Sequence, residues 1–211
     1  MSSVAESAKK HWQLLLNIYI FLNVAGYGIW RGCHAWQAGQ FHLIDLSFAA
    51  QNVVMLTFIL LRQEHRAVNT NILHQTVALL AFFSGLLFIG QAPSGGVLTS
   101  AVSSGIIFTA NLLGLVTLLN LGRSFGILIA LRQVKTGGLY SIIRHPMYGT
   151  DILLRIGFVV GHFNLFTIFL FTISTGAYVT RAMLEERFLL QDEAYQDYVG
   201  RVKYRFIPFV F

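Results

Sequence analysis

The chain has little charge and almost no cysteine. Only 11% of its 211 residues are charged and 55% are hydrophobic, whereas about a quarter of the residues in an average soluble domain are charged. A soluble fold of this length cannot bury so much apolar surface, so the composition predicts an integral membrane protein. The single cysteine, Cys33, excludes an internal disulfide and a cysteine-based zinc or iron–sulfur site, and the histidines show no metal-binding spacing.

Apolar segments that match or approach the length of a bilayer crossing run along most of the chain. They cover residues 12–30, 41–61, 72–91, 97–122, 146–161 and 163–183. About 20 helical residues cross the ~30 Å hydrocarbon core. The tight turn between the last two segments favours a helical hairpin, and the charged, aromatic segment 185–202 favours an amphipathic interfacial helix. The expected fold is an all-α, polytopic membrane helix bundle of about six transmembrane helices.

The basic residues give a formal net charge of +6 and lie mainly beside the apolar segments. With six spans and a cytosolic N-terminus, nearly all lysines and arginines of the loops and tail fall on the cytosolic side, and only Arg31 falls on the other. Membrane topology therefore explains the positive charge better than nucleic-acid binding does. It places both termini, the loop 123–145 and the tail 184–211 on the cytosolic face.

The segment 137–148 concentrates polar and aromatic side chains in an otherwise apolar half of the chain. Pro146 predicts the start of a helix, because its fixed φ suits the first turn. Gly137 and Gly138 allow the backbone to approach a ligand closely, and the free N–H groups of a helix start attract anions. The segment is therefore a candidate ligand-binding loop.

Ionisable side chains continue along the helix that Pro146 begins. Tyr148, Asp151 and Arg155 follow one another at spacings of three and four, which places them on one helix face. Charged groups at this depth are costly unless they are paired or face a polar cavity. Asp151 and Arg155 either pair with each other or line a ligand cavity, and both interpretations stay open.

The last apolar segment returns to the same side of the membrane. Its end brings Arg181, Glu185 and Glu186 level with His145 and Tyr148, and Arg181 and Glu185 share a helix face because they are four residues apart. These side chains form either a solvated charge cluster beside the membrane or one wall of a site. The glycine pair in the neighbouring loop favours the second interpretation, in which these side chains form one wall of a site.

Several short motifs of the C-terminal half occur in a distinctive order. They are Leu121-Gly122-Arg123-Ser124-Phe125, Gly138-Leu139-Tyr140, Arg144-His145-Pro146-Met147-Tyr148, Arg181, Glu185-Glu186, Tyr195, Tyr198, Val202 and Ile207-Pro208-Phe209. This order resembles that of the isoprenylcysteine carboxyl methyltransferase and phospholipid methyltransferase superfamily of membrane enzymes. The resemblance covers about residues 121–210, and the first four apolar segments carry no specific signature.

The resemblance implies S-adenosyl-L-methionine as cofactor and membrane lipids or a lipid-like molecule as methyl acceptor. It divides the chain into residues 1–122, a scaffold of four transmembrane helices with substrate access, and residues 123–211, which bind the cofactor and act on the acceptor. The implied cofactor-binding residues are Gly138, Leu139, Tyr140, Arg144, His145, Pro146, Tyr148, Glu185 and Glu186. The implied catalytic residues are Arg181, near the acceptor, and Glu185.

Two positions depart from the pattern of that family. The family usually has a glycine two places after the motif tyrosine, and this chain has Gly149 followed by Thr150. Asp151 stands where the family often has a glutamate. Packing behind the loop is therefore expected to differ at these positions.

The acceptor and the reaction class stay open in the sequence. A carboxylate acceptor, such as a prenylcysteine, would favour a free arginine such as Arg181, whereas an amine would favour Glu185 or Glu186 as base; a small thiol is a third choice. The tail 202–211 also resembles that of the sterol reductases, which makes an NADPH-dependent membrane reductase the alternative enzyme. A membrane scaffold or transporter is less favoured, because the polar residues cluster at one face.

Overall fold

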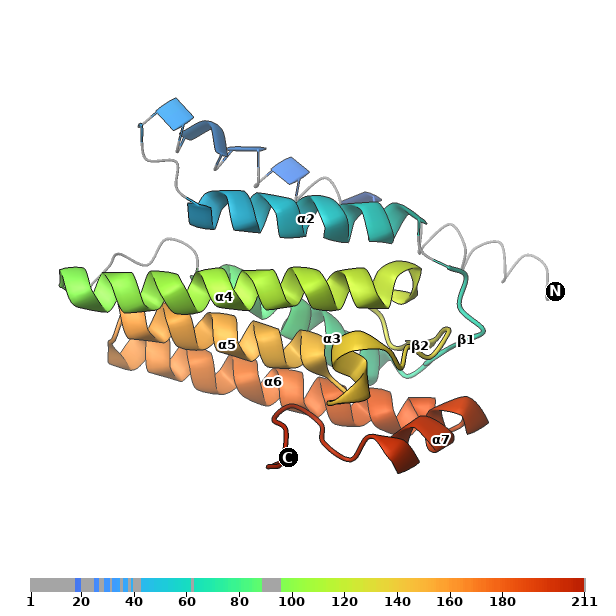
Figure 1. The fold of residues 1–211 in the computed structure, drawn as a ribbon. Coiled ribbons are helices and arrows are strands. Elements are labelled where there is room, and N and C mark those ends of the chain that lie inside the picture. Colours follow the sequence, from blue (N-terminus) through green and yellow to red (C-terminus); the bar gives the residue numbers. More distant parts are fainter. Residues whose placement is uncertain are drawn as a thin grey trace.

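The computed structural model describes residues 18–19, 25–26, 29–30, 32–34, 36–37, 39, 43–61, 63–88 and 96–210 (Figure 1). The expected span 12–30 lies mostly outside these residues. The described part is mainly helical, in agreement with the all-α expectation. It also contains a short two-stranded sheet that the sequence did not indicate.

The helices follow the apolar segments of the sequence. In chain order the elements are α2 (Leu43–Leu61), β1 (Ala67–Val68), α3 (Ile72–Phe83), the 3₁₀ helix η1 (Ser84–Phe88), α4 (Val97–Leu121), η2 (Gly122–Ser124), β2 (Ala130–Leu131), η3 (Gly138–Ser141), α5 (Pro146–Gly161), α6 (Leu165–Leu189) and α7 (Glu193–Arg201). Helices α4, α5 and α6 lie side by side, α2 packs on α4, and α3 packs on α6 (Figure 1). The sheet and α7 gather at one end of this bundle.

Three helices of the described chain are long and apolar enough to cross a membrane. They are α2, α4 together with η2, and α6. Helix α3 has 12 residues before it tightens into η1, and α5 has 16 residues. The long helices fit a membrane protein, and the count of six spans stays a prediction.

Small residues bring α4 and α5 into close contact. The Ser103 hydroxyl donates a 2.7 Å hydrogen bond to the backbone carbonyl of Gly157. A methyl group on Gly157 would lie 2.7 Å from Ile107 Cγ1, and one on Gly161 would lie 2.5 Å from Ser103 Oγ. Because glycines four residues apart share a helix face, the backbones of these two helices approach without intervening side chains.

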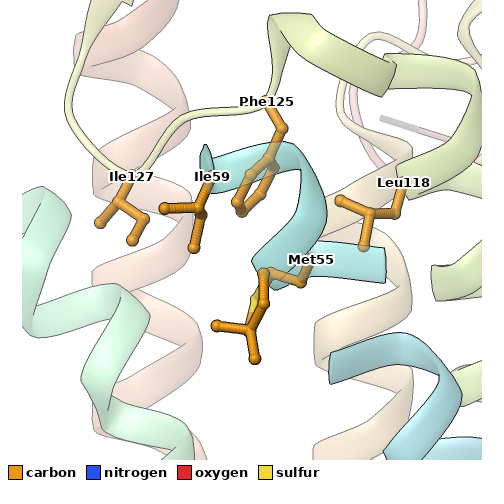
Figure 2. Close-up of a cluster of buried hydrophobic side chains, with 6 residues drawn as sticks. Met55, Ile59, Leu118, Phe125 and Ile127 are labelled. Atoms are coloured by element: carbon orange, nitrogen blue, oxygen red, sulfur yellow. The ribbon is translucent and has the colours of Figure 1, made fainter. Parts of the chain in front are cut away.

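The end of α2 anchors the chain that follows α4. Met55 and Ile59 of α2 pack with Leu118 of α4 and with Phe125 and Ile127 beyond it (Figure 2). All of these side chains are at most 9% exposed. Their burial holds the segment after α4 against the bundle by the hydrophobic effect.

The two-stranded sheet fastens two connecting segments together. Strands β1 and β2 are antiparallel, with Ala67 opposite Leu131. The Gln75 side chain of α3 adds bonds to both segments, since its amide donates to the Asn69 and Ile129 carbonyls at 2.7 Å and 3.0 Å. The segment 125–135 is therefore fixed above the end of the bundle.

The tail helix begins later than the segment 185–202 indicated. Helix α6 continues without a break to Leu189, so Glu185 and Glu186 belong to its last turns. The Asp192 side chain then caps α7 by accepting a bond from the Tyr195 backbone N–H. The charged residues near 185 are thus part of the long helix, whose Glu186 is buried and bonded to Arg205 of the C-terminal tail.

Candidate functional site

The loop before α5 is held by the segment 203–206, which comes much later in the chain. The backbone N–H groups of Arg144 and His145 each donate a 2.8 Å hydrogen bond, to the carbonyls of Tyr204 and Arg205 respectively. Two consecutive bonds of this kind fix the direction in which the chain enters α5. The segment 203–206 therefore sets where the His145 side chain points.

Glu186 joins the loop, α6 and the tail through its carboxylate. Its Oε1 atom lies 3.0 Å from His145 Nε2 and 3.3 Å from a terminal nitrogen of Arg144, and its Oε2 atom accepts a 3.0 Å bond from Arg205 Nε. The Glu186 and Arg144 side chains are each 7% exposed. A carboxylate buried with several partners of this kind is well compensated, so Glu186 orders the loop.

Glu185 and Arg181 face the next residues of α5. The Glu185 carboxylate accepts a hydrogen bond from the Tyr148 hydroxyl, and the Arg181 guanidinium lies 5.2 Å from the centre of the Tyr148 ring. Arg181 also donates to the carbonyls of Ala78 and Ile127 at 3.0 Å and 2.7 Å. Because Arg181 is only 4% exposed, the interpretation of this group as a solvated charge cluster is wrong.

These side chains surround a cavity at the end of the bundle, beneath the segment 125–135. It is partly open to solvent, and its wall is formed by side chains of α5, α6, α7 and the segment 124–135. The predicted residues in its wall are Tyr140, Arg144, His145, Tyr148, Arg181 and Glu185. Gly138, Leu139, Pro146 and Glu186 are not in the wall and lie behind it, in η3, at the start of α5 and in α6.

Tyrosines give the cavity much of its aromatic surface. Burial raises the pKa of Tyr140, Tyr195 and Tyr198 far above the ordinary value of a phenol. All three therefore stay neutral and offer hydroxyl groups and ring faces. The Tyr198 hydroxyl donates a 2.8 Å bond to the Tyr140 carbonyl, which ties α7 to η3.

Several buried polar atoms in this wall have no hydrogen-bond partner among the described residues. They are Ser124 Oγ, Arg144 Nε, Arg181 Nε and the Tyr195 hydroxyl. Burying a polar atom without a partner costs about 1–3 kcal/mol. A bound molecule that carries both donors and acceptors would recover part of that cost, so the wall suits a polar ligand.

Tyr178 belongs to this site and was not predicted from the sequence. It lines the cavity from α6, and its ring is 5.4 Å from that of Tyr148. Its position three residues before Arg181 and seven before Glu185 places it on the same helix face. That spacing is the signal by which Tyr178 could have been predicted as a site residue. Lys135 and Arg132 in the segment above α6 were likewise not singled out, because an irregular segment has no periodicity to read.

Asp151 and Arg155 do not form a direct ion pair. No carboxylate-to-guanidinium contact within 4 Å joins their side chains; Arg155 instead donates to the Asp151 backbone carbonyl at 2.8 Å and to Ser84 Oγ at 3.1 Å. Its guanidinium also lies 4.4 Å from the centre of the Tyr178 ring. Asp151 lines the cavity. The interpretation of Asp151 and Arg155 as residues that line a cavity therefore fits better than the interpretation as an ion pair.

Gly138 is the position in the loop where a side chain is least tolerable. Its φ is +61°, and a methyl group there would overlap the Asn120 side-chain amide. We expect Gly138→Ala to destabilise the protein by more than the ~1–2 kcal/mol that a left-handed residue costs by itself. Thermal unfolding in detergent, followed by tryptophan fluorescence, measures the effect.

The neighbouring Gly137 provides the matched control. Its φ is −96° and nothing lies within 4 Å of the position of a methyl group. Gly137→Ala is therefore expected to leave the unfolding temperature nearly unchanged. Equal losses in the two variants would contradict the close approach of η3 to Asn120.

Comparison of the chain with known protein families and with curated proteins finds no match. The chemistry of the cavity is therefore the guide to function. That chemistry combines neutral aromatic rings, the Glu185 carboxylate and the basic side chains of Arg132 and Lys135 in one wall. Such a wall can bind a molecule that carries positive and negative groups together with an apolar or aromatic part.

Proposed function

We propose that this protein is an integral membrane methyltransferase that uses S-adenosyl-L-methionine. The observation that carries the proposal is the mixed wall of the cavity, with the tyrosine rings and Glu185 beside Arg132 and Lys135. The cofactor contains a sulfonium and an ammonium cation, a carboxylate and an aromatic base. Cations favour ring faces and carboxylates, and carboxylates favour arginine and lysine, so each group of the cofactor has a partner here.

The chain's own residues take distinct roles in this proposal. The side chains of Tyr140, Tyr148 and Tyr178 would exclude water from the cation. Glu185 accepts a hydrogen bond from the cofactor's ammonium or ribose. Glu186 is a positioning residue, because both of its oxygens are engaged by the loop and the tail.

The bound cofactor would supply a methyl group on a positively charged sulfur. Most of the catalysis then comes from holding the acceptor in line with that group and from keeping water out. The cavity lies where the long apolar helices end, so a lipidic acceptor would reach it from the bilayer. The distribution of lysine and arginine supports a cytosolic site.

Replacing Glu185 with glutamine tests the proposal. The change keeps the size of the side chain and removes its charge, so we expect the dissociation constant for S-adenosyl-L-methionine to rise about 10- to 100-fold, as for loss of a hydrogen bond to a charged group. Isothermal titration calorimetry on the purified protein in detergent measures it. NADPH, titrated in parallel, is expected to show no binding.

Glu193→Gln is the matched control, because Glu193 is exposed in the first turn of α7. This variant is expected to bind the cofactor as the wild type does. Tight binding of NADPH without binding of S-adenosyl-L-methionine would replace the proposal with the reductase alternative. Unchanged cofactor binding in Glu185→Gln would remove Glu185 from the site.

A further inference from the structure

A second cavity adjoins the first, deeper among the helices. It lies between α2, η1, α5 and α6 and is partly open. Its walls are mostly apolar and include Met55, Phe88, Leu154 and Phe158. Phe82, Met147, Asp151 and Tyr178 line both cavities, so the two spaces meet at these side chains.

The junction contains the carboxylate of Asp151, which no basic side chain of the described residues neutralises directly. No ion pair within 4 Å joins Asp151 to any basic residue of the described chain. Asp151 and Tyr178 both line this junction. Since a carboxylate accepts about four hydrogen bonds, Asp151 keeps the capacity to accept from a molecule at the junction.

The terminal nitrogens of the nearby Arg155 and Arg181 already donate hydrogen bonds within the protein. The terminal nitrogens of Arg155 donate to Ser84 and to the Asp151 carbonyl, and those of Arg181 donate to the carbonyls of Ala78 and Ile127. A carboxylate ligand binds best to a guanidinium that presents two parallel N–H groups. In each arginine both terminal nitrogens are thus engaged and only Nε lacks a partner among the described residues, so neither offers two unengaged nitrogens to a carboxylate.

We propose that the second cavity binds the methyl acceptor and that Asp151 selects an amphipathic amine. The apolar chain of the amine lies against Met55, Leu154 and Phe158, and its nitrogen donates a hydrogen bond to the Asp151 carboxylate at the mouth of the first cavity. A carboxylate head group would instead place a second negative charge beside Asp151, without an arginine that offers it two unengaged nitrogens. The identification of the occupant as the acceptor rests on the proposed function, whereas the amine site rests on the junction itself.

Photoaffinity labelling locates the occupant directly. The probe is a twelve-carbon primary amine with a diazirine at its far end, and its partner probe is the matching twelve-carbon carboxylic acid. Both are used with the protein in phosphatidylcholine nanodiscs, and labelled peptides are mapped by mass spectrometry. The amine is expected to label the peptides of Met55, Leu154 and Phe158, with competition by unlabelled amine, and the acid to leave them unlabelled.

Asp151→Asn is expected to reduce labelling by the amine at these peptides about tenfold or more, as for loss of a bond to a charged group. Asp197→Asn, an exposed aspartate of α7, is the matched control and is expected to label as the wild type does. Leu154→Trp, which places a large ring in the second cavity from a position outside the wall of the first, is expected to abolish labelling there. Thermal unfolding of each variant checks that it is folded.

Two results would overturn the inference. One is equal labelling of the cavity peptides by the acid and by the amine, and the other is unchanged labelling by the amine in a folded Asp151→Asn variant. Calorimetry with S-adenosyl-L-methionine on the same wild-type protein tests the proposed function separately. Labelling that depends on Asp151 without cofactor binding would retain the amine site and refute the methyltransferase.

Discussion

Replacing Glu186 with alanine is expected to lower the free energy of unfolding by about 3–5 kcal/mol, the usual cost of removing one partner of a buried ion pair. The variant leaves Arg144 and His145 beside a space without a carboxylate, and Arg144 is only 8% exposed. It also cuts the link from Arg205 of the tail to α6. Titration with a denaturing detergent in mixed micelles, followed by tryptophan fluorescence, measures the change.

Two variants separate this effect from a general effect of charge on α6 and α7. Glu193→Ala removes an exposed carboxylate and is expected to change the free energy of unfolding by less than about 0.5 kcal/mol. Glu185→Gln, one residue before Glu186, is expected to weaken cofactor binding while the fold persists. A Glu186→Ala protein as stable as the wild type would show that the tail and loop do not depend on this carboxylate.

Replacing Gly157 with leucine is expected to separate α4 from α5. Even a methyl group at this position lies 2.7 Å from Ile107 Cγ1 and 3.2 Å from the Ile107 backbone nitrogen, and backbone atoms cannot move aside as a flexible side chain can. Overpacking usually costs about 1–3 kcal/mol and sometimes more. We expect the upper end or beyond, because the Ser103 bond to the Gly157 carbonyl is broken as well.

Gly176→Leu is the matched control for Gly157→Leu. Gly176 is also in the middle of an apolar helix, is exposed, and has nothing within 4 Å of the position of its missing methyl group. A leucine there is expected to be neutral or to stabilise α6 by up to about 1 kcal/mol, since glycine is a poor helix former. Similar unfolding temperatures for both leucine variants would contradict the close packing of α4 and α5.

The helices could be predicted from the sequence because apolar runs mark them directly. The start of α5 at Pro146 and the end of α2 at Leu61 agree with the segments 146–161 and 41–61. The sheet could not be predicted, because strands of two residues such as Ala67–Val68 have no pattern of their own. Their pairing depends on contacts between residues that are far apart in the sequence, and no short stretch of sequence reveals such contacts.

Helix spacing also predicted that the site residues converge. It could not predict which of them face the cavity and which are held by other parts of the protein. Glu185 and Glu186 are neighbours in sequence, yet one faces the cavity and the other is held by Arg205 and the loop. That difference depends on where the tail lies. The tail contributes backbone carbonyls, which every residue has, so sequence carries no signal for its bonds to Arg144 and His145.

The bonds between the segment 203–206 and the loop before α5 have a consequence for biosynthesis. The loop leaves the ribosome about sixty residues before its partner does, and α5, α6 and α7 are made in between. A nascent chain that stops short of residue 203 can form its helices but cannot orient His145 through these bonds. The cavity is therefore expected to acquire its final shape late in synthesis, after the long helices are already in place.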